Sequence, residues 1–269
     1  LTSKDFNDIE KVLKAECNSD NLEFVLSVLH ARIRFLESIL HLSYKIPLKK
    51  WQVRGQEKVV VAETKQNIQE RFKKEMGLLV DKPKQGYGNS NDGNTARRFF
   101  NDPEKSAAIT GVSVEIIKRF KVILKAIASG HTIDTEKFRT YALDTAKLFI
   151  EKYPWYPMSP TVHKILIHGP DVISSALIPI GQLSEEAQEA NNKVFRRYRE
   201  SFSRKMSREK TNEDVLRRLL ISSDPYISSL EETPIVKKTI DKEVLDLILP
   251  PNIGWYSEKE SSDGSSDSD

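Results

Sequence analysis

Acidic residues give way abruptly to basic residues in the segment SEEAQEANNKVFRRYR, residues 184–199. On a helix, Glu186, Glu189 and Lys193 share one face, because residues three or four positions apart are neighbours there. A phosphodiester-transfer site needs this combination, since carboxylates hold Mg²⁺ and bases bind the flanking phosphates. The segment therefore indicates either part of such a site or a solvated helix stabilised by a Glu-to-Lys pair.

Two histidines, His163 and His168, lie five residues apart. On an ideal helix their side chains point about 140° apart, so they converge only if the helix distorts or ends between them, and Gly169-Pro170 supplies such an end. The spacing falls in the His-x3–5-His range of zinc sites, which need two further ligands. Cys17 is the only cysteine and there is no CxxC, so this chain cannot complete a Cys2His2 site. The alternative is a pair of packing and capping residues.

Glycines and basic residues meet in the segment DKPKQGYGNSNDG, residues 81–93, which leads into Asn94, Arg97 and Arg98. A glycine-rich loop lets backbone amides approach phosphates, and paired arginines at a helix start are suited to clamp them. The segment lacks the GxxxxGK[ST] motif, so a nucleotide-hydrolysing P-loop is not supported. The alternative is an ordinary flexible connection.

The small net charge of +3 hides an uneven distribution. Residues 193–210 contain eight bases and two acids, a net charge of +6, whereas residues 257–269 carry −4. A local basic excess attracts polyanions, of which nucleic acid is the usual one. A solvated helix face explains the same charges.

The 269 residues are 38% hydrophobic and 30% charged, which is typical of globular proteins and excludes a fibrous or wholly disordered chain. No apolar run approaches the ~18–20 residues that a membrane helix needs, so no membrane partner is expected. The single cysteine excludes an internal disulfide framework.

Helical periodicity dominates and strand signals are scarce, so the sequence predicts a mainly α fold. Gly77 and Pro154 stop two helices, Asp134 caps one, a further helix starts at Asp102-Pro103, and Gly169-Pro170 separates two short ones. The predicted helices span about residues 22–44, 56–76, 94–100, 114–129, 135–153, 160–168, 171–177, 184–205, 212–221 and 238–249.

These elements suggest a division of the chain into five regions. They are an N-terminal segment 1–20, a helical region 21–155 with the basic Gly-rich loop 81–93, a region 156–230 with the histidines and the acid-to-base helix, a C-terminal helix in 231–254, and an acidic Ser-rich tail 255–269. The tail lacks the apolar residues needed for order, so we expect disorder there.

The three pieces, in this order on a helical chain, resemble the family of Transib transposases and the related catalytic subunit of the V(D)J recombinase. The resemblance runs from about Leu29 to about Leu230, and its most specific element is GQLSEEAQEANNKVFRRYRE, residues 181–200. It implies that Glu189 is the third acid of an Asp-Asp-Glu triad. It also implies that His163 and His168 are the histidine half of a structural zinc site, and that residues 92–98, DGNTARR, lie near DNA.

The fold implied by the resemblance is the helical C-terminal portion of an RNase H-like (DDE) transposase without its N-terminal β-sheet. In that family both aspartates and the CxxC lie upstream, in the sheet. We therefore expect Leu1 to mark the start of a truncated gene model, a decayed element or a domesticated remnant.

The implied function is that of a fragment of a cut-and-paste transposase, in the nucleus, acting on double-stranded DNA at transposon ends and homodimeric in the parent protein. Glu189 would contribute to a Mg²⁺ or Mn²⁺ site. For Zn²⁺ the chain would supply only two of the four ligands, His163 and His168. One carboxylate cannot hold two metals about 3.5–4 Å apart, so we expect no cleavage by this chain alone. The expected DNA contacts are Lys193, Arg196, Arg197, Arg199, Asn94, Arg97 and Arg98.

Two other functions remain open. One is a domesticated helical module for DNA or protein interaction without catalysis. The other is a free-standing metal-dependent hydrolase that uses Glu186 and Glu189 with a histidine. The second is weaker, because its acids and histidines lie in separate segments with no partner to orient them.

Overall fold

The computed structural model describes residues 26–84, 88–230 and 241–249, and within these ranges the chain is mainly helical, which confirms the predicted α class. The helices of the body are α2 (Val28–Ser43), α3 (Glu57–Met76), α4 (Gly93–Asn101), α5 (Pro103–Thr110), α6 (Val114–Ile127), α7 (Thr135–Lys152), α8 (Pro160–His163), the π-helix η3 (Lys164–His168), α9 (Gly169–Ser175), the 3-10 turn η4 (Ile180–Leu183) and α13 (Lys242–Leu245). No helix in the described ranges is long and apolar enough to cross a membrane.

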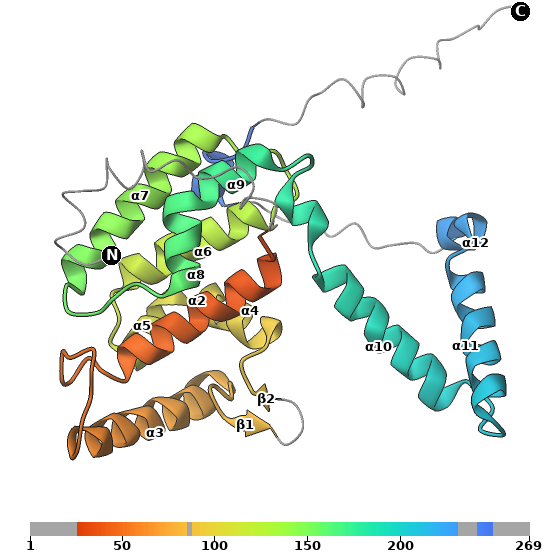
Figure 1. Ribbon diagram of the computed structural model, residues 1–269, viewed down its shortest axis with the longest axis horizontal. Coiled ribbons are helices and arrows are strands. Elements are labelled where there is room, and N and C mark those ends of the chain that lie inside the picture. The colour runs from red at the N-terminus through yellow and green to blue at the C-terminus, as the bar shows by residue number, and fades with distance from the viewer. Residues whose placement is uncertain (1–25, 85–87, 231–240, 250–269) are drawn as a thin grey trace, which may run out of the picture.

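The remaining helices form what we call the arm: α10 (Glu186–Ser201), α11 (Arg208–Ser222) and α12 (Pro225–Leu230). Helices α10 and α11 pack on each other. Figure 1 shows the arm extending to one side of the body, with α10 leading away from it and α11 beside α10.

The core of the body lies where α2, α6 and α7 meet. Phe120 of α6 is fully buried, with its ring edge-on to Phe35 of α2 at 4.7 Å between centroids and stacked on Phe149 of α7 at 6.3 Å. Burial of large apolar side chains is the main favourable contribution to folding. The three aromatic rings therefore tie together segments that are far apart in the sequence.

Local signals set many helix ends as predicted. The Asp134 carboxylate accepts a hydrogen bond from the Lys137 amide and caps α7, and Asp102 caps α5 in the same way. Gly77 ends α3 at a φ of 62°, a left-handed conformation that favours glycine.

Three local predictions were wrong. The loop 81–93 contains a short antiparallel hairpin of β1 (Pro83–Lys84) and β2 (Gly88–Asn89). Gly169-Pro170 does not separate two helices but begins α9, since proline is tolerated in a first helical turn. The helix expected over 238–249 covers only Lys242–Leu245 within the described residues.

Both ends of the arm lead back to one short connection, residues 128–134, which we call the α6–α7 loop. Before the arm, Gln182 Nε2 donates to the Gly130 carbonyl at 2.9 Å, and a Cβ on Gly181 would lie 2.4 Å from the Gly130 nitrogen, so only glycine fits there. After the arm, the Leu249 amide donates to the Thr132 carbonyl at 2.8 Å. The α6–α7 loop thus anchors the chain where it leaves for the arm and where it returns.

Candidate nucleic-acid interface

Helix α10 carries the four basic residues whose pattern in the sequence predicts contacts with DNA. Lys193, Arg196, Arg197 and Arg199 are all exposed. Arg196 and Arg197 lie three and four positions after Lys193, so the three residues form a stripe about 100° wide along the helix. Among the described side chains, none of the ion pairs involves these four residues. The stripe therefore offers its charge to solvent.

An aromatic ring orients one of these bases. The Arg197 guanidinium lies 5.4 Å from the centroid of the Phe202 ring, and that of Arg218 on α11 lies 4.9 Å from the same centroid. Arg218 Nε also donates to the Phe202 carbonyl at 3.1 Å. Guanidinium groups are attracted to the faces of aromatic rings. Phe202 thus links α10 to α11 and restricts where Arg197 can point.

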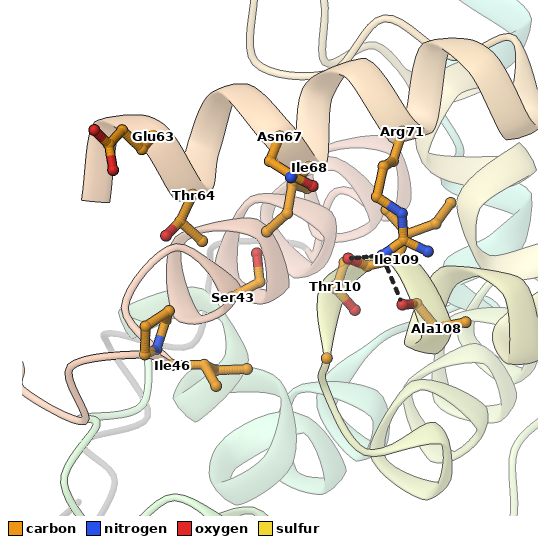
Figure 2. A pocket seen from close by; sticks show the side chains of 12 residues that line it. Ser43, Ile46, Glu63, Thr64, Asn67, Ile68, Arg71, Ala108, Ile109 and Thr110 are labelled. Carbon is orange, nitrogen blue, oxygen red and sulfur yellow. Dashed lines mark hydrogen bonds between the residues drawn. The ribbon is translucent and has the colours of Figure 1, made fainter. Parts of the chain in front are cut away.

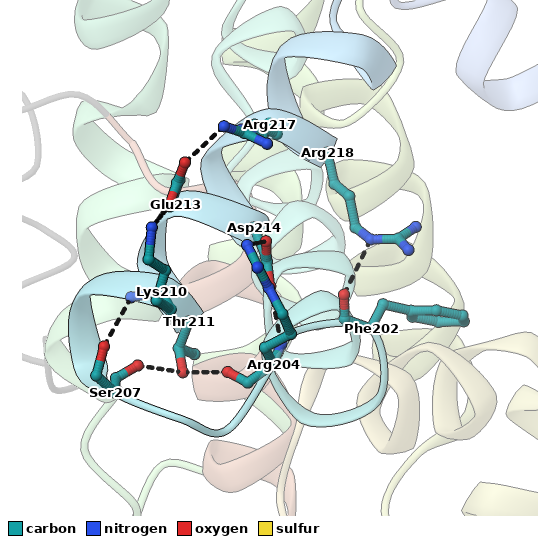
Figure 3. A network of polar contacts seen from close by, with 9 residues as sticks. All are labelled: Phe202, Arg204, Ser207, Lys210, Thr211, Glu213, Asp214, Arg217 and Arg218. Carbon is teal, nitrogen blue, oxygen red and sulfur yellow. Dashed lines mark hydrogen bonds and ion pairs between the residues drawn. The ribbon is translucent and has the colours of Figure 1, made fainter.

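A polar network fixes the turn between the two helices of the arm (Figure 3). Arg204 donates to the two oxygens of Asp214 through Nε at 2.9 Å and Nη2 at 2.8 Å, and its own amide donates to Asp214 at 2.9 Å. The Thr211 hydroxyl lies 2.7 Å from the Arg204 carbonyl. Bidentate arginine–carboxylate pairs constrain geometry as well as charge. The network therefore braces the arm that carries the basic stripe.

Replacing Asp214 by asparagine should loosen this turn. The hydrogen bonds from Arg204 hold the pKa of the Asp214 carboxyl well below its usual range. A lowered pKa means that the contribution to stability is present above the ordinary aspartate pKa and is lost only as pH falls through the depressed value. We therefore expect faster amide hydrogen exchange in residues 202–211 of the variant at neutral pH. Glu209→Gln is the matched control, and equal exchange in both variants would refute the bracing role.

The acid proposed as a metal ligand, Glu189, belongs to α10 by its backbone, three residues after the helix begins. Its side chain and that of Glu186 lie outside the described residues. The neighbouring Glu185 is described, and its Oε2 lies 3.1 Å from His30 Nδ1 and 3.0 Å from the Ser27 hydroxyl. These contacts join the start of α2 to the start of the arm.

This Ser27–His30–Glu185 cluster was not found from the sequence. Glu185 is 158 positions from Ser27, and no local pattern signals a contact at that separation. The one available signal is that Ser27 caps α2, accepting from the His30 amide at 3.2 Å, so its side chain is fixed at a helix start.

The two predicted histidines converge, and the helix distorts between them as their convergence required. Residues Lys164–His168 form the π-helix η3, whose wider turn brings positions five apart onto one side. The ring centroids of His163 and His168 lie 5.4 Å apart at an interplanar angle of 64°. Burial lowers the pKa of His163, and the neighbouring His168 lowers it further. Neutral imidazoles are the form that binds metals.

The chemistry of this pair fits half of a zinc site. In the described ranges no group of three or more His, Cys, Asp and Glu side chains is placed to hold a metal ion. Zinc in structural sites is almost always four-coordinate. A zinc site built on His163 and His168 would therefore need two further ligands.

The residues after the Gly-rich loop lie in α4, in the body. Asn94 and Arg97 are exposed. Arg98 Nη2 donates to the Met76 carbonyl at 2.6 Å and thereby caps the end of α3. Basic side chains often satisfy the last carbonyls of a helix in this way. Arg98 has this structural contact in addition to its predicted role.

The body also carries a groove of about 450 Å³ between α2, α3 and α5 (Figure 2). One wall is a polar row on α3 formed by Glu63, Asn67 and Arg71. Arg71 Nη1 donates to the carbonyls of Ala108 and Ile109, at 3.0 and 3.3 Å, and so closes one end of the groove. None of the residues predicted from the sequence to act on DNA or metal lines it.

The sequence was also compared with known proteins. No protein-family model and no curated protein matches the chain. Its function must therefore be inferred from the arm, the histidine pair and the order of the motifs along the chain.

Proposed function

We propose that this chain is the C-terminal helical portion of a Transib-like DNA transposase or recombinase, RNase H-like in the parent protein, and that it binds double-stranded DNA through α10. The observation that carries the proposal is the exposed basic stripe Lys193, Arg196 and Arg197 with Arg199 beside it, on a helix braced by Arg204 and Asp214. The stripe follows directly on the acid that the family motif assigns to metal binding.

Phosphate binding needs positively charged side chains that are exposed and whose orientation is restricted. A helix of 16 residues such as α10 is about 24 Å long, and duplex DNA carries one negative charge per about 1.7 Å of axis. Several phosphates therefore lie within reach of the basic stripe at once. Contacts of this kind bind DNA without reading its sequence, so we propose that the arm positions DNA and leaves sequence recognition to other parts of the parent protein.

Catalysis would require two acidic metal ligands in addition to Glu189. In the proposed parent, Glu189 would be one of three acids holding two Mg²⁺ or Mn²⁺ ions that activate the attacking oxygen. Glu189 alone cannot hold both ions, and we assign neither aspartate in this chain. We therefore propose that the chain binds DNA but neither cleaves nor joins it by itself.

The histidine pair is proposed to contribute to a structural zinc site. When zinc is bound, it would cross-link the π-helix η3 to the segment that supplies the other two ligands. The nearness of the two rings, with centroids 5.4 Å apart, supports this role. Because a transposase acts on chromosomal DNA, the proposal includes a nuclear location. The family resemblance adds a homodimeric parent protein.

The test is binding of the purified chain to a random-sequence duplex, followed by fluorescence anisotropy over a salt series, with and without Mg²⁺ or Mn²⁺. We expect binding at low salt that weakens steeply as salt rises, and no nicking with either metal. Absence of binding at low salt would contradict the DNA-binding role. Binding that vanishes at physiological salt would favour the domesticated interaction module. Metal-dependent nicking that is lost in Glu189→Gln would show that the chain is catalytically complete.

A further inference from the structure

The basic stripe on α10 keeps its charge available to an anion from outside the arm. Among the described side chains, neither the stripe nor the neighbouring Arg199 belongs to an ion pair. The acids of α11 that form ion pairs, Glu213 and Asp214, hold other bases of the arm. An anion that binds the stripe therefore displaces none of these ion pairs.

The acidic tail, residues 255–269, has the opposite charge. Its residues 257–269 contain five acids and one lysine, a net charge of −4, against the +6 of residues 193–210. The bases of the body are more evenly mixed with acids, since α3 contains five bases and four acids. Exposed charges of opposite sign attract each other over about 8–10 Å at moderate salt. The arm therefore complements the charge of the tail better than α3 does.

The chain enters the tail near the base of the arm. Leu249, the last described residue, is held by Thr132 of the α6–α7 loop, and the same loop holds Gln182, four residues before α10 begins. Given the span of these short connections and of two helical turns, Lys193 lies at most roughly 50 Å from Leu249. Fully extended, residues 250–269 would span roughly 65–70 Å. The acids of the tail are thus able to reach the stripe of the same molecule.

We propose that the acidic tail binds the basic stripe of its own chain and competes there with DNA. A tethered ligand acts at an effective concentration on the order of millimolar when its linker spans the two sites, so weak contacts suffice. DNA binds only while the tail is off the stripe, and the apparent dissociation constant for DNA rises as the free fraction falls. The competition rests on the proposed DNA binding through α10, whereas the contact between tail and stripe does not.

The first test detects the tail contact without DNA. A nitroxide spin label is attached to the full chain at Ser262→Cys in a Cys17→Ser background, and backbone amide NMR signals are compared before and after the label is reduced. We expect signal loss at residues 193–200 at low salt. The loss should disappear in about 1 M salt, where the Debye length is about 3 Å. Replacing the stripe and Arg199 by glutamate should also abolish it.

A label on a second copy of the chain is the control for contact between molecules. When that copy carries the label and the observed copy does not, residues 193–200 should keep their signals. Equal signal loss in this mixture would contradict binding within one chain. No loss at low salt, or a loss that the glutamate replacements leave unchanged, would overturn the proposal.

The second test measures the competition by fluorescence anisotropy with the random-sequence duplex at low salt. Neutralising the acids of the tail should tighten DNA binding at least about threefold, because the stripe is then free for a larger fraction of the time. The tail-neutral variant combines Glu258→Gln, Glu260→Gln, Asp263→Asn, Asp267→Asn and Asp269→Asn.

The matched control removes the same charge from the body. It neutralises five exposed acids, by Glu63→Gln, Glu70→Gln, Glu136→Gln, Asp144→Asn and Glu151→Gln. This variant should bind DNA less tightly than the tail-neutral variant. Equal tightening in both would show that net charge alone attracts DNA, and the competition would be refuted.

Failure of the tail contact and failure of DNA binding give different results. A duplex that binds neither the natural chain nor the tail-neutral variant at low salt refutes the DNA-binding role, and with it the competition. Unchanged signals at residues 193–200, together with DNA binding that still depends on the stripe, refute the tail contact alone.

Discussion

Replacing Lys193, Arg196, Arg197 and Arg199 together by glutamate should remove most of the chain's affinity for duplex DNA. Each phosphate contact releases bound counterions, so the logarithm of the binding constant falls with the logarithm of salt concentration by about 0.9 per contact. If all four residues contact phosphates, the variant's slope should be shallower by roughly 3 to 4. Fluorescence anisotropy across a salt series measures both the affinity and the slope.

The control for this variant must change net charge equally. Replacement of four exposed lysines of the body by glutamate does so, and the chosen residues are Lys58, Lys73, Lys74 and Lys164. If net charge alone attracts DNA, both variants will lose affinity to the same degree, and the arm is then not the interface. If the arm is the interface, the body variant will keep most of its affinity and a steeper salt slope.

Replacing Phe120 by alanine should have the largest effect on stability. The side chain is fully buried between Phe35 and Phe149, so its removal leaves a cavity between α2 and α7. Phenylalanine-to-alanine changes in cores cost about 3–5 kcal/mol, a large share of the roughly 5–15 kcal/mol by which domains are stable. Urea unfolding followed by circular dichroism should show a lower midpoint.

Leu177→Ala provides the comparison, because the same kind of truncation at a fully exposed residue should change the free energy of unfolding by less than about 0.5 kcal/mol. A loss of less than about 1 kcal/mol in the Phe120 variant would mean that α6 is not the centre of the core.

The sequence predicted the structure best where the cause is local. The cap at Asp134 and the end at Gly77 follow from the side chain and the backbone freedom of single residues. The histidine pair was predicted conditionally, since spacing alone gives divergence on a regular helix. The π-helix η3, in which Ile165, Leu166 and Ile167 are buried, supplies the condition.

Contacts between distant segments were not predictable. The sequence predicts that Arg98 contacts phosphate, and in the structure it caps α3 through a carbonyl 22 residues away. Glu186 and Glu189 are the acids predicted to act, and Glu185 beside them contacts the start of α2. In both cases the residue type was informative, whereas its partner depends on how helices pack.

The α6–α7 loop has a mechanical consequence. The chain is fastened to it on both sides of the arm, through Gln182 before and Leu249 after. Part of any load applied to the arm is therefore delivered to the end of α6 and the start of α7. These two helices hold Phe120 and Phe149, so the load reaches the buried aromatic core of the body. The arm is thus connected mechanically to the core of the body through the α6–α7 loop.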